Sequence, residues 1–89
     1  MEANLEIAER AIAEHACWMT RNAARAAMRS FYAAFEDRTG EWFVEDIAEP
    51  GELTEWKRLR DDMKTAQSKL ATARAATRRA IAKATGRAE

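Results

Sequence analysis

Residues whose side chains commonly do catalytic or metal-binding chemistry are few in this chain of 89 amino acids. His15 is the only histidine and Cys17 is the only cysteine. A nucleophile–base pair would need both side chains on one side of a helix, but residues two apart point to different faces. We therefore expect His15 to lie beside a helix–helix seam and Cys17 to fill space there as a small apolar residue.

Acidic residues at helical spacing are the next candidates for chemistry. They recur three or four residues apart in two sets, Glu2, Glu6 and Glu9, and Glu45, Glu49 and Glu52. Without a fold that forms a pocket, such sets predict solvated faces rather than general acid–base pairs. The chain also has no glycine-rich phosphate loop and no CxxC motif. The sequence therefore predicts no catalytic residue, no cofactor, no metal site and no enzymatic activity.

The last third of the chain is basic and supplies the one feature that could contact nucleic acid. The side chains that could contact a phosphate backbone are Lys69, Arg74, Arg78, Arg79, Lys83 and Arg87. No aromatic residue interleaves this run, and the chain as a whole has 15 basic and 15 acidic residues. Nucleic acid is therefore an alternative partner and not the leading expectation.

Two long segments that could carry these residues contain no strong helix breaker. The only proline is Pro50, and the glycines are Gly40, Gly51 and Gly86. The segments between them are rich in good helix formers. They predict a single all-α domain over residues 1–89, an antiparallel two-helix hairpin that is coiled-coil-like. We expect helices at about residues 3–38 and 52–85, joined by a connection at about 39–51.

Each predicted helix has an apolar stripe that would face the other. In the second helix the stripe alternates steps of three and four, as in a coiled coil: Trp56, Leu59, Met63, Ala66, Leu70, Ala73, Thr77, Ala80 and Ala84. In the first helix the stripe is looser: Leu5, Ala8, Ile12, Ala16, Met19, Ala23, Ala27, Phe31 and Ala34. A second apolar set lies outside that stripe and includes Ile7, Cys17, Trp18, Met28 and Tyr32.

The connection has turn signals at both ends. Gly40 is a plausible residue to end the first helix. The stretch Glu49-Pro50-Gly51-Glu52 fits a type II turn, with Pro50 at its second position and Gly51 at its third. The residues between, 41–49, fit either one or two helical turns or an extended bend.

The charge pattern predicts which residues of the two helices lie opposite each other. An antiparallel arrangement centred on the bend pairs residue i with residue 91−i. It brings acid near base in three pairs: Glu14 with Arg78, Glu9 with Lys83, and Arg29 with Asp62. Exposed ion pairs contribute only about 0–1 kcal/mol each, so their effect is mainly on register and orientation.

Six of the seven aromatic residues fall between Phe31 and Trp56, where the hairpin would bend. The same region is acidic and has no basic side chain from Glu41 to Trp56. One interpretation is that the aromatics form the core of a closed bend and the acids are its solvated rim. The other is that Trp42 or Phe43, with Glu45 and Asp46, stays exposed as a docking surface.

These features favour a function in protein–protein contact. The leading hypothesis is a small regulatory binder or inhibitor, of the type that phages and mobile elements often encode, that covers a surface of a larger protein. The candidate contact residues are Trp18, Tyr32, Trp42, Phe43, Glu45, Asp46 and Ile47. The alternatives are a structural subunit that assembles into a helical bundle and the nucleic-acid binder described above.

The second apolar set on the first helix predicts a homo-oligomer, because those side chains need cover. The simplest form is a two-fold four-helix bundle. No apolar run approaches the about 18 residues of a membrane span, and the N-terminal segment lacks the basic region of a signal peptide. With a single cysteine the chain forms no internal disulfide. We therefore expect a cytoplasmic protein with no membrane contact.

Overall fold

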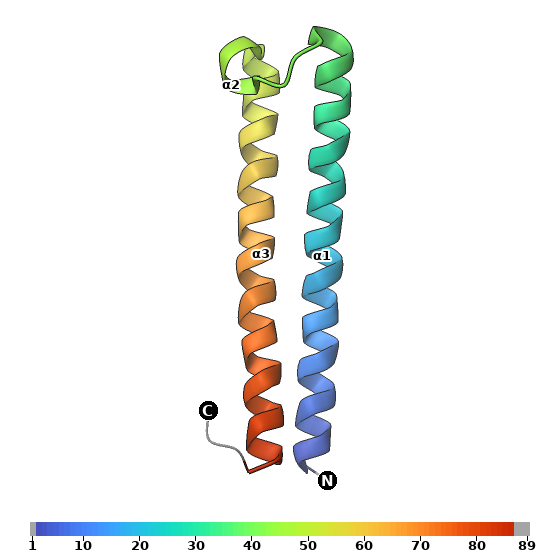
Figure 1. Cartoon of the computed structure of the whole chain (residues 1–89), viewed down its shortest axis with the longest axis vertical. Helices are drawn as coiled ribbons and strands as arrows, with labels where there is room; N and C mark the ends of the chain where they lie inside the picture. The colour runs from blue at the N-terminus through green and yellow to red at the C-terminus, as the bar shows by residue number, and fades with distance from the viewer. Residues whose placement is uncertain (1, 87–89) are drawn as a thin grey trace.

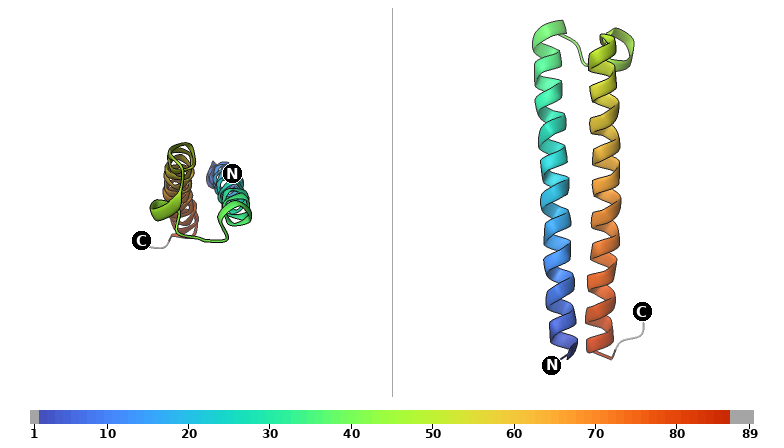
Figure 2. Two further views of the ribbon diagram at one scale, coloured as in Figure 1. Left: turned by 90° about the horizontal axis from the view of Figure 1, so that it is seen from above. Right: turned by 180° about the vertical axis from the view of Figure 1, so that it is seen from behind.

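The computed structural model describes residues 2–86 and confirms the all-α hairpin (Figure 1). Helix α1 runs from Glu2 to Thr39 and helix α3 from Pro50 to Ala84. They pack side by side and antiparallel into a rod of 56 × 19 × 17 Å. The start of α1 and the end of α3 lie at one end of the rod, and the bend lies at the other (Figure 2).

The connection contains one helical turn, α2, from Val44 to Ile47, which packs against α3. Gly40 ends α1 in the left-handed region, at φ +74°, and its N–H donates to the Glu36 carbonyl at 2.7 Å. A residue with a Cβ would be strained there. The sequence left α2 open between a helical turn and an extended bend, and the structure resolves it as the helical turn.

The predicted type II turn at Pro50-Gly51 is wrong, because both residues belong to the first turn of α3. Proline suits this position, since its missing N–H has no partner in the first turn of a helix. The carboxylate of Glu52 accepts a hydrogen bond from the Glu49 backbone N–H at 3.0 Å, as in a capping box. This cap stabilises a helix start at Pro50, and Gly51 needs no positive φ.

The core is bulky near the bend and slim along the rod. Its buried members are Phe35, Val44, Leu59, Ala66, Leu70 and Ala80. The α3 stripe that the sequence predicts supplies four of them, and of the rest of that stripe only Ala84, at the open end, is exposed. Alanine gives little burial, so most apolar burial per residue comes from the bend end.

The predicted α1 stripe is wrong. Leu5, Ile12 and Met19 point to solvent, and so do most alanines of that stripe. Instead α1 presents to α3 a strict heptad repeat that includes Ile7, Glu14, Arg21, Met28 and Phe35, all buried or half-buried. Because the repeat contains polar residues, a search for regularly spaced apolar residues does not detect it. Most of the set expected to need outside cover therefore faces α3.

The predicted register is also shifted. Lys83 lies 3.8 Å from Glu6 rather than beside Glu9. In the part of the chain that the structure describes, none of the three expected acid–base pairs forms an ion pair, and Asp62 instead pairs with Arg58 on its own helix at 3.2 Å. Exposed ion pairs are too weak to set the register against packing at the bend. The connection is also asymmetric, since α2 packs mainly against α3.

Candidate protein-binding surface

The surface of interest is the aromatic bend, which we define as Trp42, Phe43 and Ile47 with the carboxylates of Glu45 and Asp46. Trp42 and Phe43 lie in the connection just before α2, and their exposed fractions are 65% and 63%. Ile47 ends α2 and is also exposed. Large apolar side chains exposed together are unusual on a small soluble protein and commonly mark an interaction site.

Buried residues beneath the aromatic bend hold it in place. Val44, the residue after Phe43, is buried and belongs to α2, which packs on α3. The ring of Tyr32 lies 6.4 Å from the ring of Trp42, and the Tyr32 hydroxyl accepts a hydrogen bond from Trp56 Nε1 at 2.9 Å. Trp42 therefore rests on a fixed aromatic support that links α1 to α3.

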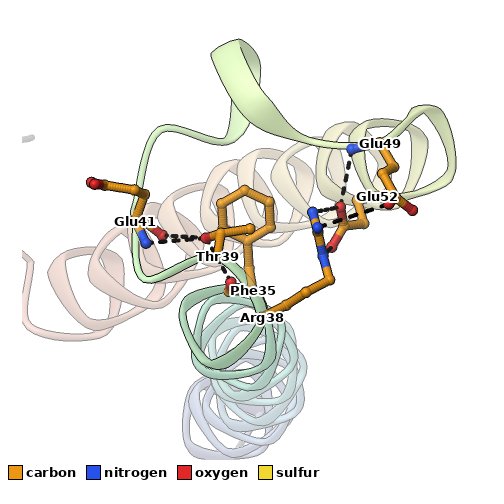
Figure 3. Close-up of polar contacts among 6 residues, drawn as sticks. All are labelled: Phe35, Arg38, Thr39, Glu41, Glu49 and Glu52. Carbon is orange, nitrogen blue, oxygen red and sulfur yellow. Dashed lines mark hydrogen bonds and ion pairs between the residues drawn. The ribbon is translucent and has the colours of Figure 1, made fainter.

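A second set of contacts braces the connection from the side of α1 (Figure 3). The Arg38 guanidinium donates two hydrogen bonds to the Glu52 carboxylate, and its Nε lies 2.8 Å from Glu52 Oε2. The Thr39 hydroxyl donates to the Phe35 carbonyl at 2.8 Å and accepts from the Glu41 N–H at 3.1 Å. The Arg38–Glu52 contact ties the end of α1 to the start of α3, and the Thr39 hydrogen bonds fix the start of the connection. Both sides of the aromatic bend are therefore anchored.

The Arg38–Glu52 contact predicts a pH dependence of stability. The hydrogen bond from Arg38, and then that from the Glu49 N–H, lowers the pKa of Glu52 below its ordinary value of 4.5. A carboxylate whose pKa is depressed by folding adds stability above its unfolded pKa, and this is lost as pH falls through the folded value. We expect the melting temperature of Glu52→Gln to change less than that of the wild type between about pH 5 and about pH 3.

The control for this prediction is Glu55→Gln, because Glu55 is exposed and its nearest cation, Arg58, is 4.0 Å away. Thermal melts followed by circular dichroism give the comparison. An identical acid response in the wild type and in Glu52→Gln would show that the brace does not contribute to the stability of the bend.

The electrostatic character of the aromatic bend is negative. Glu41, Glu45 and Asp46 are exposed, and within residues 2–86 none of them forms an ion pair. Arg38 is occupied by Glu52 and Glu49. The bend thus combines an apolar centre with an acidic edge, which suits a partner whose apolar pocket has a basic edge.

Grooves flank the bend on the α1 side. One of about 420 Å³ lies beside Trp42, with Tyr32, Met28 and Met63 among its lining residues. A smaller one of about 280 Å³ lies between Tyr32, Trp56 and the start of α2. They are open at the surface and suit side chains from a partner better than an enclosed substrate.

Trp18, another of the contact residues that the sequence predicts, is separate from the aromatic bend. It lies midway along α1 with its ring stacked on His15, the centroids 5.6 Å apart, and it is partly exposed. Cys17 is half-buried in the α1–α3 interface. Among the described residues, no cluster of His, Cys, Asp or Glu side chains could hold a metal ion.

The basic residues of α3 do not form one continuous stripe. Lys69 shares a groove with Arg10 and Cys17, and Arg79 and Lys83 share one with Glu6. Arg74 instead borders Glu14, His15 and Trp18. Arg78 is exposed, and Arg87 lies outside the described residues. The remaining candidates are thus divided among several grooves and partly neutralised by acids of α1.

Arg21 is a feature that the sequence reasoning missed. It is half-buried at the α1–α3 interface and donates to the Asn22 side chain at 3.0 Å. Partial burial lowers the pKa of Arg21, and the positive charges of Arg25 and Arg74 lower it further. The strict heptad spacing from Ile7 through Arg21 to Phe35 was the signal that could have placed it at the interface.

No protein-family model matches the chain, and neither a curated protein nor a solved structure matches it. In the described part of the chain, no helix is long and apolar enough to span a membrane. Arguments about function therefore rest on the geometry and charge of the surfaces described above.

Proposed function

We propose that this protein is a non-enzymatic binding module that uses the aromatic bend to dock on a larger protein. The observation that carries the proposal is the exposure of Trp42 and Phe43 on a connection that buried residues hold in place. A module of this kind acts most simply as a regulatory binder or inhibitor that covers a surface of its partner. A cytoplasmic location and an origin in a phage or mobile element are part of the same proposal.

Preorganisation is the physical reason why the aromatic bend suits this role. Binding costs free energy when flexible side chains or loops must be ordered, about 0.5–1.5 kcal/mol per side chain. Here Val44, Tyr32 and the Arg38–Glu52 contact hold the connection before any partner arrives. Aromatic residues at the centre of an interface also contribute most of its binding energy.

The acidic edge supports one partner chemistry in particular. Glu41, Glu45 and Asp46 favour an apolar pocket bordered by lysine or arginine. Association should therefore slow as ionic strength rises, because screened charges no longer steer the encounter. The alternative function is nucleic-acid binding through α3. These same carboxylates would repel the phosphates of any nucleic acid that also contacted the bend.

The test compares proteins captured from the native host by the wild type and by Trp42→Ala/Phe43→Ala, followed by titration of the captured partner. Loss of an interface anchor costs about 1–3 kcal/mol, so we expect the double variant to bind at least about tenfold more weakly. Both side chains are exposed, so helix content should be unchanged.

The matched control is Ile81→Ala, which removes an exposed apolar side chain from α3, far from the bend. It should bind like the wild type. Equal affinity of the double variant and the wild type would reject the aromatic bend as the docking surface. Equal weakening by Ile81→Ala would show that the surface is elsewhere.

A further inference from the structure

The outward face of α1 is apolar and uncovered. Leu5, Ile12 and Met19 recur every seven residues, with exposed fractions of 61%, 70% and 56%. Each of them lies two residues before a position of the heptad repeat that faces α3. Two residues turn the helix by about 200°, so the two faces lie on nearly opposite sides of α1. Exposed alanines fill the face between and beyond them: Ala8, Ala16, Ala23 and Ala26. The result is a second coiled-coil-like stripe on the side of α1 that α3 leaves uncovered, since all of these side chains are exposed in the hairpin.

The hairpin exposes more surface than a compact monomer of its mass. A folded monomer of 10.1 kDa exposes about 5,300 Å² by the usual scaling, whereas this chain exposes 6576 Å². The excess is about 1,300 Å², and a standard interface covers about 800 Å² on each partner. One additional helix–helix contact along most of α1 would remove a large part of the excess.

The charges of α1 favour a second copy in antiparallel orientation. Residues 2–14 contain four glutamates and one arginine, whereas residues 15–29 contain three arginines and no acid. An antiparallel pair of α1 helices places the acidic segment of each beside the basic segment of the other. A parallel pair would place like charges together, at separations comparable to the Debye length of about 8–10 Å.

Side-chain size favours one register of that pair. With Ile12 opposite Met19 of the second copy, Leu5 lies opposite Ala26 and Ala8 lies opposite Ala23. Large side chains then meet small ones at the ends of the stripe, as interdigitated helix packing requires. In this register residues 2–29 of the two copies overlap, and the rest of each α1 extends beyond the overlap.

We propose that the outward face of α1 is a self-docking surface, through which two copies form an antiparallel four-helix dimer. The aromatic bends then project from opposite ends of the assembly. This inference does not rest on the proposed docking function of the bend, but it makes such a module bivalent. Two copies of the partner could be bound at once, and avidity would be gained where those two copies belong to one oligomer.

Sedimentation equilibrium of the full chain tests the proposal. We expect a mass of about 20 kDa, twice the 10.1 kDa of the chain, falling toward the monomer on dilution. Ile12→Gln should raise the dimer dissociation constant at least about tenfold, and Met19→Gln should act in the same direction. Helix content should be kept, because both side chains are exposed.

Ile81→Gln is the matched control, since Ile81 is an exposed isoleucine on α3; it should leave the dissociation constant unchanged. A wild type that stays monomeric at millimolar concentration would overturn the proposal and leave the face to a foreign protein. A dimer that tolerates Ile12→Gln, or that is weakened equally by Ile81→Gln, would overturn it as well.

Cysteine crosslinking tests the orientation. In a Cys17→Ala background, Ala8→Cys and Ala23→Cys chains are mixed and mildly oxidised. The antiparallel register predicts that the Ala8→Cys chain links mainly to the Ala23→Cys chain, because these positions lie opposite each other. Preferential linking of each variant to itself would show a parallel dimer and reject the antiparallel geometry.

Discussion

Phe35→Ala is expected to lower the free energy of unfolding by about 3–5 kcal/mol, the range typical of removing a buried aromatic side chain. Phe35 is 2% exposed and is the largest side chain that is fully buried. Its ring lies 6.0 Å from that of Phe31, and the Arg38 guanidinium lies 5.6 Å from its centre. The substitution would leave a cavity where the largest part of the core is packed.

The matched control is Phe43→Ala, the same chemical change at an exposed position of the bend. Its effect should stay within about 0.5 kcal/mol. Urea denaturation followed by circular dichroism gives both values. A domain of this size has only a few kcal/mol of stability, so a Phe35→Ala chain that is unfolded without urea would also agree with the expectation. Equal effects of the two substitutions would contradict the assignment of Phe35 to the core and Phe43 to the surface.

Leu70→Ala is expected to cost about 2–5 kcal/mol, because among residues 2–86 Leu70 is the one large side chain that is buried midway along the rod. Its buried neighbours in the α3 stripe toward either end are Ala66 and Ala80. Alanine side chains cannot move far enough to fill the space, so the two helices would lose their main contact in this region. Leu5→Ala is the control, since Leu5 is exposed.

Thermal melts at a fixed, low protein concentration compare the two leucine variants, because dimerisation through Leu5 would otherwise add to its effect. The melting temperature should fall steeply for Leu70→Ala and little for Leu5→Ala. A larger fall for Leu5→Ala than for Leu70→Ala would show that the apolar stripe of α1 that includes Leu5 packs against α3 after all.

The α3 half of the hairpin could be read from the sequence because its stripe is both apolar and strictly periodic. Trp56, Leu59 and Leu70 stand out against charged neighbours, so only one face of α3 can turn inward. The Gly40 helix end was equally readable, because few residues other than glycine adopt its φ of +74°.

The interface of α1 could not be predicted from the sequence, because alanines occur on every face of that helix. Hydrophobicity then favoured the face of Leu5, Ile12 and Met19, whereas the interface uses a heptad that includes Glu14 and Arg21. Those residues tolerate the position because the helices form a narrow rod in which long side chains still reach solvent. Only the structure of the pair shows which face α3 covers.

The sequence shows which residues make up the aromatic bend, but it does not show which of their side chains are exposed. Which of Trp42, Phe43 and Val44 turns inward depends on the direction of α2, and that direction is fixed when Val44 packs against α3. The capping role of Glu52 and its contact with Arg38 also depend on where α3 begins. A single sequence leaves these choices open.

Trp42 is exposed in the free protein, and the proposed function requires that a partner covers it. Fluorine NMR of protein labelled with 5-fluorotryptophan tests it most directly, because the three tryptophans give three signals and Trp42→Phe identifies one of them. We predict that adding the captured partner shifts or broadens the Trp42 signal and leaves that of Trp18, which lies midway along α1, nearly unchanged. A Trp42 signal that stays fixed at saturating partner would show that the aromatic bend is not the docking surface.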